Sequence, residues 1–82
     1  NIHVNLLDHY GSTSFLLACE DGFSQIVQVL LQDNRVNVNQ VDKFTLTPLM
    51  SCCLYGRVEI VRELIKLSKV DLFSVTRRDY IQ

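Results

Sequence analysis

Hydrophobic residues near the start of the chain first recur at the spacing of one helix face. Phe15, Ala18 and Cys19 stand at positions i, i+3 and i+4, which is typical of an amphipathic helix. Thr13 precedes this face with a side chain that can cap the first turn. Gly22 follows it and can adopt the left-handed conformation that ends a helix. The pattern predicts a short helix, about two turns long, between Thr13 and Gly22.

A second apolar stripe predicts a second, longer helix. It consists of Ile26, Val27, Leu30 and Leu31, while Gln25 and Gln28 are expected to face water. The segment 36–39 then reads Val-Asn-Val-Asn, an alternation too short for a strand in a sheet. We interpret it as an extended loop.

The whole arrangement recurs 34 residues later. When residues 8–41 are laid over residues 42–75, nine positions are identical, whereas about two would match in unrelated segments. Thr47 and Pro48 are expected to begin the second short helix and Gly56 to end it. In the second long helix the apolar stripe is Ile60, Val61, Leu64 and Ile65, and the residues expected to face water are Arg57, Arg62, Glu63 and Lys66.

A repeat of this kind predicts an all-α solenoid. Isolated helices of this length do not persist in water, but stacked helix pairs hide each other's apolar flanks. Equivalent positions such as Ile26 and Ile60 are then expected to have the same surroundings. We predict a single domain over residues 1–82, with a partial repeat at 1–7, repeats at 8–41 and 42–75, and a divergent start of a further repeat or a cap at 76–82.

The two copies resemble the opening of the ankyrin repeat. The segments DHYGSTSFLLACEDG and DKFTLTPLMSCCLYG are similar to the family pattern Asp-x-x-Gly-x-Thr-Pro-Leu-His-x-Ala-Ala-x-x-Gly, and the spacing is close to the family's period of about 33 residues. The resemblance implies helix-turn-helix units joined by extended loops and β-turn fingers. Thr45 departs from the pattern where a turn glycine is usual, and Asn34 is expected to be left-handed in place of a loop glycine.

The same resemblance implies a non-catalytic protein–protein interaction module that binds through its concave face and loop tips. Several large apolar side chains are expected there without a packing role, which is typical of an interface centre. An alternative is that some of them cover the turn of a neighbouring unit. The predicted binding residues are His9, Tyr10, Glu20, Asp21, Lys43, Phe44, Leu46, Leu54 and Tyr55.

Composition and candidate chemistry favour no other class of function. The net charge of −1 provides no field for collecting nucleic acid, and no apolar run approaches the roughly 20 residues that span a bilayer. Neither a catalytic grouping nor a cofactor motif is present, so we expect no enzyme, no cofactor and no small-molecule substrate. The candidate metal ligands are Cys19, Cys52, Cys53, His3 and His9, whose spacing fits no metal pattern.

Cys19, Cys52 and Cys53 are instead interpreted as small side chains buried between helices. Three cysteines, two of them adjacent, form no disulfide framework and fit a reducing compartment, so an intracellular location, cytoplasmic or nuclear, is expected. The alternative function is a structural spacer or regulatory segment of a larger ankyrin-repeat protein or enzyme. Uncapped ends of the stack would then expose apolar faces and permit self-association.

Overall fold

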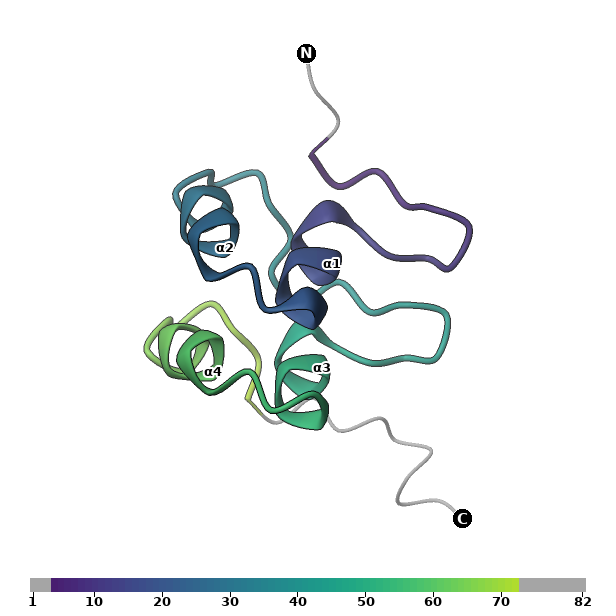
Figure 1. Ribbon diagram of the computed structural model, residues 1–82. Coiled ribbons are helices and arrows are strands. Elements are labelled where there is room, and N and C mark those ends of the chain that lie inside the picture. Colours follow the sequence, from purple (N-terminus) through teal and green to yellow (C-terminus); the bar gives the residue numbers. More distant parts are fainter. Residues whose placement is uncertain (1–3, 73–82) are drawn as a thin grey trace.

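The computed structural model describes residues 4–72 and places two helix pairs one above the other (Figure 1). Within these residues there are four helices and no strand: α1 (Ser14–Asp21), α2 (Ser24–Leu31), α3 (Pro48–Leu54) and α4 (Val58–Ile65). The inner helices α1 and α3 pack together, as do the outer helices α2 and α4. Two fingers, residues 8–12 and 42–46, extend from the inner helices away from the outer ones (Figure 1). The prediction of an all-α repeat solenoid is confirmed, whereas the expected cap at 76–82 lies outside the described residues.

Both inner helices begin as the sequence predicts, and α1 also ends as predicted, whereas α3 ends at Leu54 with Tyr55 as its cap, ahead of Gly56. The hydroxyls of Thr13 and Thr47 accept hydrogen bonds from the backbone N–H groups of Leu16 and Met50, both at 3.1 Å. Pro48 occupies the first turn of α3, where no intrahelical N–H is required. Gly22 closes α1 at φ +77°. The expectation that the outer helix is longer fails in the first unit, because α1 and α2 both span 8 residues.

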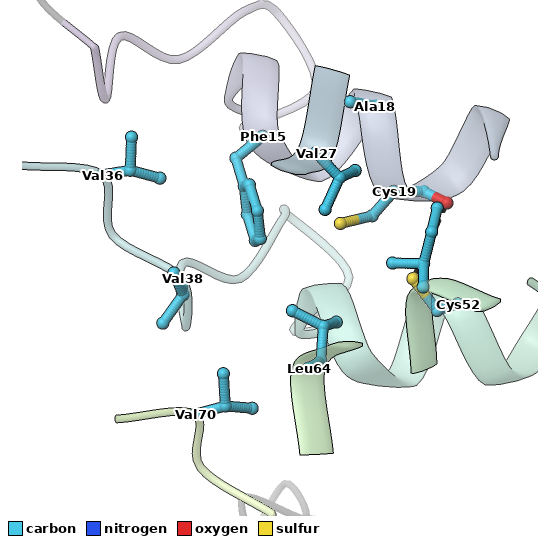
Figure 2. Close-up of a cluster of buried hydrophobic side chains, with 10 residues drawn as sticks. Phe15, Ala18, Cys19, Val27, Val36, Val38, Cys52, Leu64 and Val70 are labelled. Carbon is cyan, nitrogen blue, oxygen red and sulfur yellow. Dashed lines mark hydrogen bonds between the residues drawn. The ribbon is translucent and has the colours of Figure 1, made fainter. Parts of the chain in front are cut away.

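The core lies between the inner and outer helices and continues through both units (Figure 2). Phe15, Ala18 and Cys19 are buried, which confirms the predicted face of α1. Small side chains let α1 and α3 approach closely, so that the Cys52 thiol points at the carbonyl of Cys19 with 3.7 Å between sulfur and oxygen. The loops that follow α2 and α4 are here called the closing loops. Their valines, Val36, Val38 and Val70, cover this core at one edge (Figure 2).

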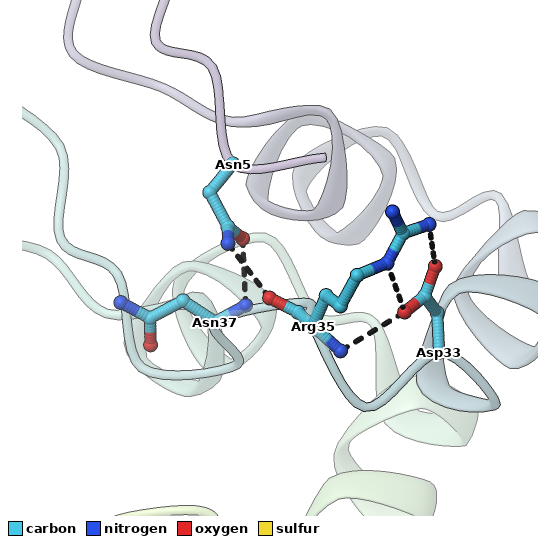
Figure 3. A network of polar contacts seen from close by, with 4 residues as sticks. All are labelled: Asn5, Asp33, Arg35 and Asn37. Carbon is cyan, nitrogen blue, oxygen red and sulfur yellow. Dashed lines mark hydrogen bonds and ion pairs between the residues drawn. The ribbon is translucent and has the colours of Figure 1, made fainter. Parts of the chain in front are cut away.

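Two asparagines tie each closing loop to the next by the same pair of hydrogen bonds. Asn5 Nδ2 donates to the carbonyl of Arg35 at 2.7 Å, and its Oδ1 accepts from the backbone N–H of Asn37 at 2.7 Å (Figure 3). Asn39 repeats both bonds one unit later, to the carbonyl of Lys69 and from the N–H of Asp71, each at 2.8 Å. These amides fix the spacing of the loops because each satisfies a donor and an acceptor of the neighbouring backbone.

The turn before the first closing loop is held by a carboxylate and not by a left-handed residue. Among the described residues Thr45 is the one non-glycine with positive φ, so the expectation for Asn34 is wrong. Asp33 accepts from the backbone N–H of Arg35 at 2.9 Å and binds its guanidinium at 3.0 and 2.7 Å (Figure 3). The hydrogen bonds from the Arg35 side chain and backbone lower the pKa of the Asp33 carboxyl to about 2.

Equivalent positions in the two units are not equally buried, contrary to prediction. Ile60 is 2 % exposed because α4 packs against α2, whereas Ile26 is 50 % exposed. Cys53 is likewise exposed although its equivalent, Cys19, is buried. In a stack, each unit covers one face of the next, and within residues 4–72 no second unit covers Ile26 or Cys53 as their equivalents are covered.

Arg57 was also expected to face water, and instead it bridges the two units. Its Nε donates to the carbonyl of Glu20 at 2.8 Å. That carbonyl lies in the last turn of α1, where backbone oxygens have no partner within the helix. The side chain therefore joins the start of α4 to the end of α1 in the preceding unit.

Candidate binding surface

The fingers are held in shape by an aspartate at the base of each one. Asp8 Oδ1 accepts from the backbone N–H groups of Tyr10 and Ser12 at 2.8 and 2.9 Å. In the second finger, Asp42 Oδ1 accepts from Phe44 and Leu46 at 2.8 and 3.0 Å. A carboxylate that bonds its own backbone two residues on fixes a tight turn. The finger tips are consequently presented in a defined conformation before any partner arrives.

A cation bridges the two finger tips. The Lys43 ammonium lies 5.0 Å from the centre of the Tyr10 ring and 5.2 Å from the centre of the Phe44 ring. Both distances are within the range of a cation–π interaction, and the backbone N–H of Lys43 also donates to the carbonyl of Tyr10 at 3.1 Å. Tyr10 and Phe44 nevertheless remain 61 % and 66 % exposed. We name this group, His9, Tyr10, Lys43, Phe44 and Leu46, the finger patch.

Two members of the finger patch are placed differently from the aromatic pair. His9 is exposed at the tip of the first finger. Leu46 is half-buried at the base of the second finger, where its carbonyl accepts a hydrogen bond from the N–H of Asp42 at 3.1 Å. Leu46 therefore contributes part of its surface to the packing of the finger itself. The structure thus places the Lys43 ammonium in contact with the rings of Tyr10 and Phe44, which the sequence did not predict.

The other four predicted residues form a separate group at the far ends of the inner helices. Asp21 is the last residue of α1, Leu54 is the last residue of α3, and Tyr55 follows directly. Because an eight-residue helix is about 12 Å long, this group lies about that far from the base of the fingers. We name Glu20, Asp21, Leu54 and Tyr55 the helix-end patch. Leu54 and Tyr55 are exposed, whereas Glu20 is half-buried.

The first half of the helix-end patch is acidic. Partial burial, followed by the nearby carboxylates of Asp42, Asp21 and Asp8, raises the pKa of Glu20 above its ordinary value. Neighbouring negative charge disfavours the ionised form of a carboxyl group, and burial has the larger effect here.

Lys43 and Arg57 are the two residues whose position the sequence did not reveal. The sequence analysis predicts Lys43 as a binding residue without indicating its contacts, whereas the structure holds its ammonium between two rings. For Arg57 the sequence offers no comparable signal, since its equivalent in the first unit is Phe23 and periodicity within one helix does not show a contact with the preceding unit.

Cys19 lies in surroundings unsuited to reactivity. The hydrogen bond with the Cys52 thiol, together with burial, raises the pKa of the Cys19 thiol well above its usual range. A thiol that stays protonated is a poor nucleophile. Within residues 4–72 no three side chains of His, Cys, Asp or Glu come together as a metal site. In the same range, no helix has the length and apolar character needed to cross a bilayer.

The sequence matches the model of a known protein family. A family model described as ankyrin repeats, in three copies, covers residues 1–75 of this chain. A search of curated proteins finds no match. Ankyrin repeats are generally protein–protein interaction modules.

Proposed function

Because the chain belongs to the ankyrin repeat family, we propose that it is a non-catalytic module that binds a protein partner through the finger patch and the helix-end patch. The observation that carries this proposal is the Lys43 ammonium seated between the Tyr10 and Phe44 rings, both of which stay exposed. Exposed aromatic side chains held in place are typical of interface centres. Little reorganisation is needed on binding, because the finger carboxylates already fix the backbone.

The charges of the two patches define the partner's chemistry. Opposite the finger patch, the partner presents apolar side chains to the rings and an acidic group to Lys43. Opposite Glu20 and Asp21 it presents basic groups, since these two adjacent residues both carry carboxylates. The free cysteines fit a reducing compartment, and we place the interaction inside the cell, in the cytoplasm or the nucleus.

The experiment is affinity capture with three forms of the chain at matched concentration. The double variant Tyr10→Ala with Phe44→Ala removes both rings, and Gln28→Ala with Arg62→Ala is a matched control on exposed positions of the outer helices. We expect proteins captured by the wild type and by the control to be lost from the ring variant. Far-UV circular dichroism should be the same for all three forms. Capture of the same proteins by the ring variant would refute the proposed site.

A second candidate is a structural spacer or regulatory segment in a larger ankyrin-repeat protein or enzyme. The exposed apolar side chains on α2, such as Ile26 and Val29, favour it, since a further unit would bury them. The sequence of the complete open reading frame distinguishes the candidates. Flanking repeats whose finger tips lack aromatic residues would favour the spacer.

A further inference from the structure

The internal repeat identifies two end faces on the stack, because each position has an equivalent at the junction between the units. Ser51 is 0 % exposed at that junction, whereas its equivalent Leu17 is 39 % exposed. Ile60 and Ile26 differ in the same sense, so these positions turn toward the preceding unit. Glu63 lines a groove with Gln28 of α2, and its equivalent Val29 is exposed. We name Leu17, Phe23, Ile26 and Val29 the leading face.

The opposite end is defined by positions that are buried in the first unit and open in the second. Cys19 and Val27 are fully buried, whereas Cys53 is exposed and Val61 is half-buried. We name Cys53, Leu54, Gly56, Val58 and Val61 the trailing face. A groove of about 290 Å³ lies on it, with mainly apolar walls from Cys53, Gly56, Val58 and Val61, and with Arg57 and Arg62 also at its border.

The junction inside the chain shows how such a groove is filled. At the equivalent place in the first unit, the Arg57 side chain lies over Gly22, with its Cδ 3.1 Å from the position that a Cβ would take. Arg57 also donates to the carbonyl of Glu20. Over Gly56, by contrast, no atom of residues 4–72 lies within 4 Å of the corresponding position. Within the described residues, the trailing face therefore has no counterpart of the side chain that Arg57 supplies at the internal junction.

The side chains of the leading face are suited in chemistry to the surface around Gly56. Phe23 is the equivalent of Arg57, and Leu54 is the equivalent of Glu20. At the internal junction, the cationic side chain of Arg57 lies at the end of α1, beside Glu20. The equivalent residues on the end faces are the ring of Phe23 on the leading face and the side chain of Leu54 on the trailing face. Both residues are exposed in this chain. Phe23 and Leu54 would thus form an apolar contact between two copies, at the place where Arg57 and Glu20 form a polar contact inside the chain.

Net charge supports the same pairing. Residues 1–41 carry one basic and four acidic side chains, a net −3, and residues 42–82 carry seven basic and five acidic side chains, a net +2. Within residues 42–72 the count is five basic and four acidic side chains, a net +1, so docking of the first unit of one copy on the second unit of another sets an acidic unit against a weakly basic one.

We propose that the occupant of the leading face is the trailing face of a second copy of this chain, docked head to tail. Phe23 of one copy covers Gly56 of the next, and Ile26 takes the place beside α4 that Ile60 takes beside α2. The contact continues the interface already present between the units. Because it joins two different faces, it is heterologous, and because it continues the stacking of the units it extends the stack by one copy at a time.

The test is the solution mass of the chain and of two blocked variants. Ile26→Asp places a charge on the leading face and Cys53→Asp places one on the trailing face, both at exposed positions. We expect the average mass of the wild type to rise steadily up to about 1 mM by light scattering. Each variant alone should remain a monomer. Their equimolar mixture should stop at twice the monomer mass, because one intact leading face meets one intact trailing face.

Controls separate this arrangement from other forms of association. Asn34→Asp adds the same charge on an exposed loop and should associate as the wild type does. Val29→Asp replaces Ile26→Asp if circular dichroism shows loss of helix in the latter. A monomeric wild type at about 1 mM, or a mixture that stays monomeric, would overturn the proposal. So would association of Cys53→Asp alone, which indicates a symmetric contact between leading faces.

Discussion

Thr45 is a β-branched residue in a conformation that favours glycine. Its φ is +65°, close to the +73° of Gly11 at the equivalent position of the first finger. A left-handed conformation costs a residue with a Cβ roughly 1–2 kcal/mol. The strain is tolerated because the Asp42 carboxylate fixes the turn on both sides, through Phe44 and Leu46.

Replacing Thr45 with glycine should therefore stabilise the protein. Thr45→Gly removes the strain but adds about 0.5–1 kcal/mol of backbone entropy to the unfolded chain, so we expect a net gain of about 0.5–1 kcal/mol in the free energy of unfolding, measured with urea. Gly11→Ala is the reverse experiment and should destabilise, since its Cβ would lie 3.1 Å from the backbone nitrogen of Lys43. An unchanged or lower stability for Thr45→Gly would show that this turn is unstrained.

The closing loops are the elements whose order depends most on single side chains. They contain no helix or strand in the described part of the chain, so their backbone groups bond instead to the side chains of Asn5 and Asn39, here called the asparagine ladder. Asn39 supplies both bonds between the two loops, while Asn37 bonds locally to Asn39 and Gln40. The two residues thus provide a matched pair of an interloop amide and a local amide.

Asn39→Ala should loosen the second loop. Loss of two hydrogen bonds, each worth about 0.5–1.5 kcal/mol, should lower the free energy of unfolding by about 1–2 kcal/mol. Amide exchange at Asp71, whose N–H donates to Asn39, should accelerate. Asn37→Ala should leave the exchange rate of Asp71 unchanged. Equal protection of that amide in both variants would mean that the ladder does not hold the loop.

At the scale of the whole molecule, the burial of a residue depends more on its position in the stack than on its identity. Ile26 and Ile60 occupy the same place in their helices, and the burial of Ile60 reflects the unit that lies over it. Ile60→Ala should cost about 2–4 kcal/mol, because a buried cavity remains. Ile26→Ala should cost less than about 1 kcal/mol in dilute solution. Equal losses of unfolding free energy in the two variants would contradict the described packing.

Local features of the fold follow from the sequence because their causes lie within a few residues. The helix starts at Thr13 and Thr47 and the end at Gly22 depend on hydrogen bonds to the adjacent turn. The finger shape depends in the same way on an aspartate and the four residues after it. Repetition of these signals at a constant spacing then predicts stacking, since short helices need neighbours.

Tertiary structure alone decided which equivalent residues are covered and which side chains meet between units. Arg57 reaches the carbonyl of Glu20 and Lys43 reaches the Tyr10 ring across more than thirty positions of sequence. Burial of Ile60 and exposure of Ile26 likewise depend on a neighbour that one unit has and the other lacks. A periodic pattern assigns every unit the same neighbours, whereas a finite stack has two ends.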